Sequence, residues 1–320
     1  MHKTAQDYIA EFRRGVAFNP NAPVTTLVSS HRIDKAGLST LSRELATGGP
    51  QVRENIVRLL EKVGLELDTP VPDKFRVIRD HAIIKALLVE GLAKDDVGAD
   101  AAVSVLRQHC MPSDLAAFGD IYLASLARQN GDYLTLSAKA KVTRALPYVQ
   151  KLAALPEWQE SEQDMQIVKI ALAALGDTVV EDSFIERARE AEKNAPPAPP
   201  NRFYNVGAAK DGTELASHLA VLGYVGTRRS LLAACSYLRS PLKSYVPDVS
   251  EQSVRYAALD AVFYNYPDEK VLYRPVKQSE WAAAEQFCTK HIGAVFDGPT
   301  PDLPRDEVYP RMQIAPNTGR

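Results

Sequence analysis

Residues 215–238 read LASHLAVLGYVGTRRSLLAACSYL, two apolar runs separated by a short turn. Because so few residues separate the runs, two helices formed there must be antiparallel neighbours. The stretch therefore predicts a helical hairpin. Its apolar positions recur at the spacing of one helix face: Leu215, Leu219, Val221, Leu222 and Val225 in the first run, and Leu231, Leu232, Cys235 and Leu238 in the second.

Polar residues and glycines indicate where these helices begin and end. Asp211 or Thr213 is suited to cap the first helix, and Thr227 is suited to cap the second. Gly223 and Gly226 are expected to loosen the end of the first helix, since glycine readily adopts the left-handed conformation that ends helices. Such a hairpin is apolar on more than one side, so it needs further hairpins on its flanks.

The hairpin pattern recurs along the chain. LAALGD at 172–177 is similar to LAVLGY at 219–224, and their glycines lie 47 residues apart. Valine–arginine pairs at 52–53 and 254–255 stand at expected helix starts. This recurrence predicts a repeat array.

Three further segments, located between these matches in the sequence, also have a helical pattern. Residues 81–108 and 113–132 read as hairpin elements. Residues 133–155 read as a longer helix that Pro147 kinks or splits. Helical periodicity therefore extends through most of the chain.

The valine–arginine helix starts and the LAALGD and LAVLGY helix ends resemble HEAT repeats, in particular the short bacterial kind. The resemblance covers residues 34–296 and is clearest over 163–265. It implies an all-α fold, a right-handed α-solenoid of about five or six stacked antiparallel helical hairpins. Tetratricopeptide repeats are the second interpretation, but their tryptophan and proline signature at a period of roughly 34 residues is absent.

Few segments have the sequence pattern of a β-strand. We expect less than roughly 5% strand, far below an ordinary globular domain. Three short segments with some β character are expected to be loops: 23–30, 204–207 and 312–315.

Proline-rich stretches divide the predicted array. Four prolines in five residues at 196–200 favour polyproline II and exclude helix. LAALGD and LAVLGY read as equivalent units across this stretch, which favours a loop with repeats on either side. The predicted parts are an N-terminal helix and loop (1–33), HEAT-like repeats (34–193), a proline-rich linker or loop (194–210), HEAT-like repeats (211–296) and an extended proline-rich tail (297–320).

Composition and motifs exclude several kinds of site. The formal net charge of the 320 residues is −2, so nothing draws the whole chain toward nucleic acid or anionic lipid. The cysteines Cys110, Cys235 and Cys288 are too sparse for a disulfide framework or a zinc site. We expect each of them to be buried and to pack as a small apolar residue. The six histidines include no i, i+4 pair and no HExxH motif. We therefore expect no metal and no cofactor. We expect His218 to be a half-buried histidine at the surface.

Catalytic motifs are also absent. The chain contains no GxSxG, no GxGxxG and no phosphate-binding loop with its lysine. HEAT-like solenoids do include the alkylation-repeat DNA glycosylases, and short HEAT-like repeats occur in bilin lyases. A DNA groove needs a basic track, whereas residues 151–200 carry 5 basic and 10 acidic side chains, and no residue marks a chromophore site. No catalytic or cofactor-binding residue is predicted.

These features favour a non-enzymatic scaffold or adaptor that binds another protein through its helical-repeat surface, an expectation drawn by analogy with the architecture. The alternative is a nucleic-acid-binding or DNA-repair protein of the alkylation-repeat kind on the same solenoid. No motif indicates a particular partner or an oligomeric state. Neither a signal peptide nor a membrane span is visible, so the default location is the cytoplasm, with the periplasm or secretion open if a signal peptide was removed.

The partner surface is expected within residues 224–274. Seven of the thirteen tyrosines and seven basic residues lie there, and tyrosine and arginine are enriched at interface hot spots. A turn and a helix end should leave Arg228, Arg229 and Arg239 solvated, whereas Arg255 has the alternative role of a structural arginine. The candidate partner-binding residues are Tyr224, Arg228, Arg229, Tyr237, Arg239, Tyr245, Arg255, Tyr264, Tyr266 and Arg274.

Overall fold

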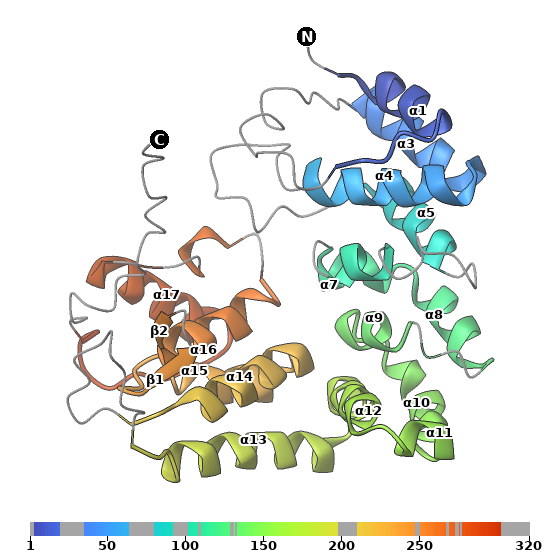
Figure 1. The fold of residues 1–320 in the computed structure, drawn as a ribbon. Coiled ribbons are helices and arrows are strands. Elements are labelled where there is room, and N and C mark those ends of the chain that lie inside the picture. The colour runs from blue at the N-terminus through green and yellow to red at the C-terminus, as the bar shows by residue number, and fades with distance from the viewer. Residues whose placement is uncertain are drawn as a thin grey trace, which may run out of the picture. The chain divides into compact units, whose positions relative to one another are not determined.

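A computed structural model of the chain is mostly helical, which confirms the all-α class (Figure 1). One short antiparallel hairpin forms the two-stranded sheet of the described part of the chain, and isolated bridges join Pro197 to Lys210 and Asp211 to Lys243. The expected loops at 23–30, 204–207 and 312–315 lie outside the described residues. The structure describes residues 3–19, 35–63, 80–91, 102–107, 110–128, 131, 133–197, 210–246, 250–266, 269–272, 275 and 277–301.

Internal contacts divide the chain into two compact units. Unit 1 comprises Met1–Val180 and Tyr266–Asp268, and unit 2 comprises Glu181–Asn265 and Glu269–Arg320. Helix α13 (Thr178–Lys193) begins in unit 1 and continues in unit 2.

Unit 1 is built from helices that pack on their neighbours. Helix α3 packs on α1, α4 and α5, and α12 packs on α9, α10 and α11. The elements are α1 (Ala5–Arg13), α3 (Lys35–Thr47), α4 (Pro50–Val63), α5 (His81–Gly91), a helical segment at 102–107, α7 (Pro112–Ala116), α8 (Gly119–Leu126), α9 (Leu134–Lys139), η1 (Thr143–Ala145), α10 (Leu146–Ala153), α11 (Pro156–Gln159) and α12 (Glu162–Leu175).

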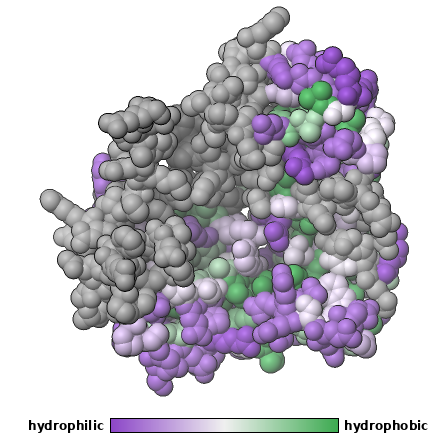
Figure 2. All heavy atoms as spheres, in the orientation of Figure 1, coloured by the Kyte–Doolittle hydropathy of each residue, from purple (hydrophilic) through white to green (hydrophobic). Residues whose placement is uncertain are grey.

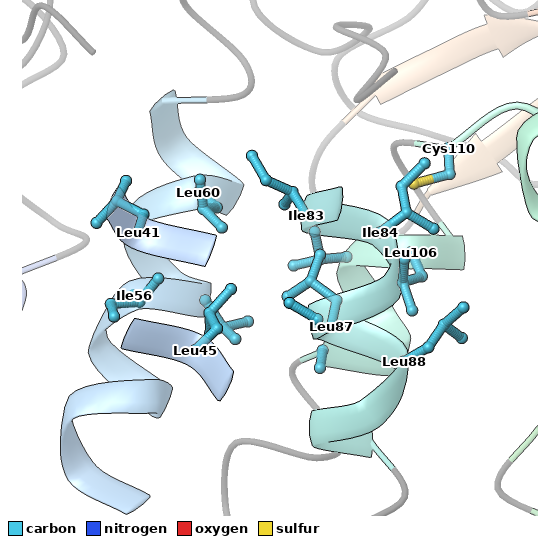
Figure 3. Packing of buried hydrophobic residues seen from close by; sticks show 14 of the residues in the cluster. Leu41, Leu45, Ile56, Leu60, Ile83, Ile84, Leu87, Leu88, Leu106 and Cys110 are labelled. Carbon is cyan, nitrogen blue, oxygen red and sulfur yellow. The ribbon is translucent and has the colours of Figure 1, made fainter. Parts of the chain in front are cut away.

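Helix α5 illustrates why these helices require neighbours. Its side chains Ile83 and Leu87 face α3 and α4 (Figure 3). Ile84 and Leu88 point to the opposite side, toward the region of Cys110. All four of these α5 side chains are buried. A helix that is apolar on two sides is stable only between two other layers.

The predicted long helix at 133–155 is split. Helix α9 ends at Lys139, and Lys141 adopts a left-handed conformation with φ of 56° before η1 and α10 begin. Pro147 lies in the first turn of α10, where proline needs no helical N–H partner. The break therefore precedes the proline.

A buried ion pair joins α4 to α5. Arg53 Nε lies 2.5 Å from Glu90 Oε1, and the Glu90 side chain is 2% exposed. Arg53 belongs to the first valine–arginine pair, and its helix begins at Pro50. This arginine has a structural role, because removing one member of a buried pair leaves the other charge uncompensated.

Unit 1 also contains a buried lysine. Lys139 is 3% exposed, and its ammonium donates a hydrogen bond to the carbonyl of Arg107. Burial lowers the pKa of Lys139 to about 8, while the neighbouring Cys110 opposes this change. Burial also raises the pKa of the Cys110 thiol to about 12.

Unit 2 places α14 at its centre. Helix α14 packs on α15, α16 and β1, and α15 packs on α16 and α17. The elements that follow α13 are α14 (Thr213–Val225), α15 (Arg228–Cys235), β1 (Lys243–Val246), β2 (Ser250–Ser253), α16 (Val254–Phe263), η2 (Lys270–Leu272) and α17 (Gln278–His291).

The quoted hairpin is confirmed as α14 and α15. Gly226 ends α14 with φ of 58°, and the Thr227 hydroxyl accepts a hydrogen bond from Ser230 N at 3.1 Å. The Asp211 carboxylate accepts from Thr213 N at 2.9 Å. Leu232 is 42% exposed, so its expected place on the buried face is wrong.

Gly223 lies inside α14 rather than at its end. A Cβ at this position would lie 2.7 Å from the Ala261 Cα and 3.0 Å from its Cβ. Contacts this short do not occur, so only glycine allows α14 to approach α16 this closely. The expected role of Gly223 in loosening the helix end is therefore wrong.

The β1–β2 hairpin was not expected from the sequence. Its strands pair antiparallel, with Lys243 opposite Ser253 and Val246 opposite Ser250. The segment KSYV…SEQS has no apolar alternation, which removes the usual sequence signal. Gly212 N donates to the Lys243 carbonyl at 2.7 Å and so links the hairpin to the start of α14.

The two ends of the proline-rich segment meet. Asp211 N donates to the Pro196 carbonyl at 2.7 Å, and Pro197 pairs with Lys210. This pairing is consistent with the expected loop between α13 and α14. The division into repeats at 34–193 and 211–296 stays a prediction.

Replacing Gly223 by Ala should destabilise unit 2. The new methyl group meets the backbone of α16, and the cost of forcing two packed helices apart exceeds the gain in helix propensity. We expect a net loss of about 1–2 kcal/mol in the free energy of unfolding, measured by urea titration. Ser217→Ala on the exposed face of α14 is the control and should change stability by less than about 0.5 kcal/mol. Equal stability of the two variants would refute the close-approach role.

Replacing Lys139 by Met should alter the pH dependence of stability. Below about pH 8 the lysine is charged in both states, so the parent bears the full burial penalty. Between the folded value of about 8 and the unfolded value of 10.5, only the unfolded chain binds this proton, so the parent becomes more stable. Relative to Lys139→Met, the parent should gain about 3 kcal/mol across this range, measured by urea unfolding at about pH 7, 8.5 and 10.5. A difference that stays constant with pH would contradict the buried-lysine account.

Candidate partner-binding surface

The end of the α14–α15 hairpin carries the exposed members of the predicted set. Tyr224 is 48% exposed and packs edge to face against Tyr264 of α16, with ring centroids 5.0 Å apart. The Asn265 amide donates to the carbonyls of Gly223 at 2.8 Å and Ala261 at 3.1 Å. These bonds connect the ends of α14 and α16, so the tyrosine pair stands on a fixed backbone.

Arg228 is the first residue of α15 and follows Tyr224 closely in the sequence. Its side chain is exposed, and its Nε donates to the carbonyl of Ile292 at 3.0 Å. Leu232 follows one helical turn later on the same exposed face. Tyr224, Arg228, Arg229, Leu232 and Tyr264 are together called the hairpin-end surface.

Arg229 is exposed but already paired. It lies 3.4 Å from Glu181 Oε2 and also forms an ion pair with Asp182. Glu181 is buried, and it also accepts a hydrogen bond from Thr227. Arg229 therefore fastens α15 to α13 and contributes less free charge to the surface than Arg228.

Arg239 is a structural residue rather than a solvated one. Its Nε and Nη2 each donate to Glu285 at 2.8 Å, and the two side chains are only 20% and 7% exposed. The bond to Glu285 raises the pKa of Arg239 further. The expectation that the end of α15 leaves Arg239 solvated is therefore wrong, because α17 supplies a buried carboxylate opposite it.

The same pair holds the beginning of the C-terminal tail. Arg239 Nη2 donates to the Gly298 carbonyl at 3.1 Å, and Thr300 Oγ1 donates to Glu285 at 2.7 Å. Gln278 also donates to the Thr300 carbonyl at 2.8 Å. Residues 302–320 lie outside the described part of the chain.

Two more predicted residues lie in the core of unit 2. Arg255 is 8% exposed and donates to the Ser240 carbonyl at 3.1 Å, which matches its alternative structural role. Tyr237 is 5% exposed, and burial raises its pKa to about 12. Neither side chain is available to a partner in this conformation.

The remaining three predicted residues are not assigned to the hairpin-end surface. The side chain of Tyr245 and the whole of Arg274 lie outside the described residues. Tyr266 is half-buried and belongs to unit 1. Of the predicted set, Tyr224 and Tyr264 are thus in ring contact, and Arg228 and Arg229 begin the helix that follows the turn after Tyr224. The exposed Leu232, which the sequence placed on the buried face, lies one helical turn after Arg228.

A polar groove lies between α13 and α14. Its volume is about 350 Å³. His218 is half-buried, as expected, with its Nε2 3.7 Å from Glu214 Oε1. The groove contains no serine, threonine or cysteine nucleophile among its lining residues, which are Arg187, Glu190, Ala191, Asn194, Glu214 and His218.

The outward face of α13 is hydrophilic. Figure 2 shows mainly purple residues along the lower edge of the view, where α13 lies. Its exposed charged residues include both signs: Asp182, Glu186, Arg187, Arg189, Glu190, Glu192 and Lys193. This face therefore presents no continuous basic track.

No group of three or more histidine, cysteine or acidic residues is placed to hold a metal ion within the described ranges. No helix among the described residues has both the length and the apolar character needed to cross a membrane.

Comparison with known proteins gives no match: no family model, no curated protein and no solved structure is similar to this chain at a significant level.

Replacing Arg239 by Ala should destabilise unit 2 strongly. The change leaves the buried Glu285 carboxylate without its cation, at a cost of about 3–5 kcal/mol in the free energy of unfolding. Adding Glu285→Gln should recover part of this loss, because no uncompensated charge remains. Arg144→Ala is the control, since Arg144 and Asp120 form an exposed pair worth less than about 1 kcal/mol. A loss for Arg239→Ala no larger than the control, measured by urea titration, would contradict the structural role.

Proposed function

We propose that this chain is a non-enzymatic scaffold or adaptor that binds another protein through the hairpin-end surface. One observation carries the proposal: the exposed Tyr224 packs edge to face on the half-buried Tyr264, and the exposed Arg228 and Leu232 follow on α15. The backbone beneath this tyrosine pair is fixed by internal hydrogen bonds. Tyrosine and arginine dominate interface hot spots because each combines large contact area with directional hydrogen bonds.

The proposed scaffold is a HEAT-like solenoid of stacked hairpins. Glycine-ended helices α12 and α14 and the valine–arginine starts of α4 and α16 support it. Helix α5, apolar on two sides, further supports it. An array of this kind offers an extended surface to a macromolecular partner.

The fixed geometry of the surface favours binding. Tyr224 is held by Tyr264, and Arg228 is held by the Ile292 carbonyl, so a partner need not order these long side chains. Among the described residues, no carboxylate forms an ion pair with Arg228. The complementary partner segment therefore carries a carboxylate for Arg228 and an apolar side chain for Tyr224 and Leu232.

A protein partner is favoured over nucleic acid. Arginine and tyrosine also suit phosphates and bases, so a DNA-binding or DNA-repair role is the alternative. However, Arg229 lies beside Glu181 and Asp182, and these carboxylates oppose the approach of a phosphate backbone. The surface suits a single acidic contact better than a run of phosphates.

The test combines Tyr224→Ala, Arg228→Ala and Leu232→Ala in one full-length variant. Affinity capture from the source cell, quantified by mass spectrometry, should recover the partner with the parent and at least tenfold less with the triple variant. This loss corresponds to about 1.4 kcal/mol or more, as expected when hot-spot residues are truncated. The melting temperature should change by only a few degrees, because all three side chains are exposed.

The matched control replaces two exposed residues of unit 1, Arg144 and Val179, by Ala. It should retain full partner recovery. Equal recovery by the triple variant and the control would remove the hairpin-end surface from the site. Submicromolar binding to duplex DNA with a steep salt dependence would instead favour the nucleic-acid alternative.

A further inference from the structure

Two cysteines that lie far apart in the sequence meet in the core of unit 2. Cys235 is the last residue of α15, and Cys288 lies in the final turn of α17. Both are fully buried, and the two helices pack together. The Arg239–Glu285 ion pair and the bond from Arg228 to the Ile292 carbonyl lie on either side of the two cysteines along the chain and hold the segments that carry them together. Cys110, the third cysteine, is buried in unit 1.

The environment of Cys235 keeps its thiol protonated in the folded, reduced protein. The hydrogen bond with Cys288, together with burial, raises the pKa of Cys235. Since the thiolate is the reactive form and both cysteines are buried, the folded pair is protected from oxidants. Oxidation then requires that the chain be folding, or that α15 and α17 open locally.

We propose that Cys235 and Cys288 are a disulfide site, and that exchange with a low-molecular-weight disulfide joins α15 to α17. The cross-link would close a long loop that contains α16 and the β1–β2 hairpin. Helix α17 also carries Glu285, the partner of Arg239. The disulfide therefore reinforces the connection that holds residues 297–300 on unit 2.

The thiol–disulfide exchange proceeds in two steps. One cysteine loses its proton, and its thiolate attacks the small disulfide, which forms a mixed disulfide and releases one small thiolate. The second cysteine thiolate attacks the protein sulfur of the mixed disulfide, which forms the Cys235–Cys288 bond and releases the second small thiolate. Two protein thiols are oxidised, one disulfide is reduced to two thiols, and the two protons pass to the released thiolates.

The experiment refolds the reduced full-length chain with a mixture of reduced and oxidised glutathione. Free thiols are then alkylated under denaturing conditions and mapped by mass spectrometry. We expect a linked pair of peptides that contain Cys235 and Cys288, with Cys110 alkylated. The oxidised protein should melt higher than the reduced protein by about 5 °C or more, because the cross-link restricts the unfolded chain.

Variants separate this pair from chance oxidation. Cys110→Ser should still form the link, whereas Cys235→Ser should leave both remaining cysteines free. Mapping of the parent alone decides the question even if a variant fails to fold. The proposal is overturned if Cys235 and Cys288 stay alkylatable under these conditions, if either is joined mainly to Cys110, or if the linked protein melts below the reduced one.

Discussion

The close approach of α14 to α16 is the constraint on which unit 2 depends. Gly223 has no side chain, and this absence lets the backbone at Ala261 come within a distance that any Cβ would forbid. Once the helices are this close, Asn265 can bridge their ends and Tyr264 can reach Tyr224. The turn at Gly226 then sets α15 against the same pair. The proposed binding surface is therefore a consequence of one glycine contact.

Charged residues reinforce this arrangement from inside. Two buried carboxylates of unit 2, Glu181 and Glu285, are each paired with an arginine of the α15 region, Arg229 and Arg239. In both cases the arginine stays partly exposed while the carboxylate is buried. Arginines that looked like a binding patch in the sequence thus mostly hold the fold together. Arg228, bound to a carbonyl rather than a carboxylate, is the member best suited to a partner.

The local features of the fold could be predicted, and the contacts between distant segments could not. Gly226 and Thr227 define a helix end and a helix start by backbone conformation and capping, which depend on adjacent residues. The pairing of Arg239 with Glu285 and the meeting of Cys235 with Cys288 depend on how α15 lies against α17. Sequence spacing contains no record of that packing. The β1–β2 hairpin was missed for a related reason, since its stability comes from contacts with α14 rather than from its own pattern.

Native-state amide hydrogen exchange tests the central claim, that tightly packed α14 and α16 form the rigid base of the hairpin-end surface. The account predicts that amides in the second half of α14, from Leu219 to Val225, and in α16, from Ala258 to Val262, are among the slowest to exchange in unit 2. Their protection should approach that of global unfolding, because these helices cannot open without losing the Gly223 contact. Exchange of the α14 amides at the rate of an unfolded peptide, while other unit 2 helices stay protected, would contradict it.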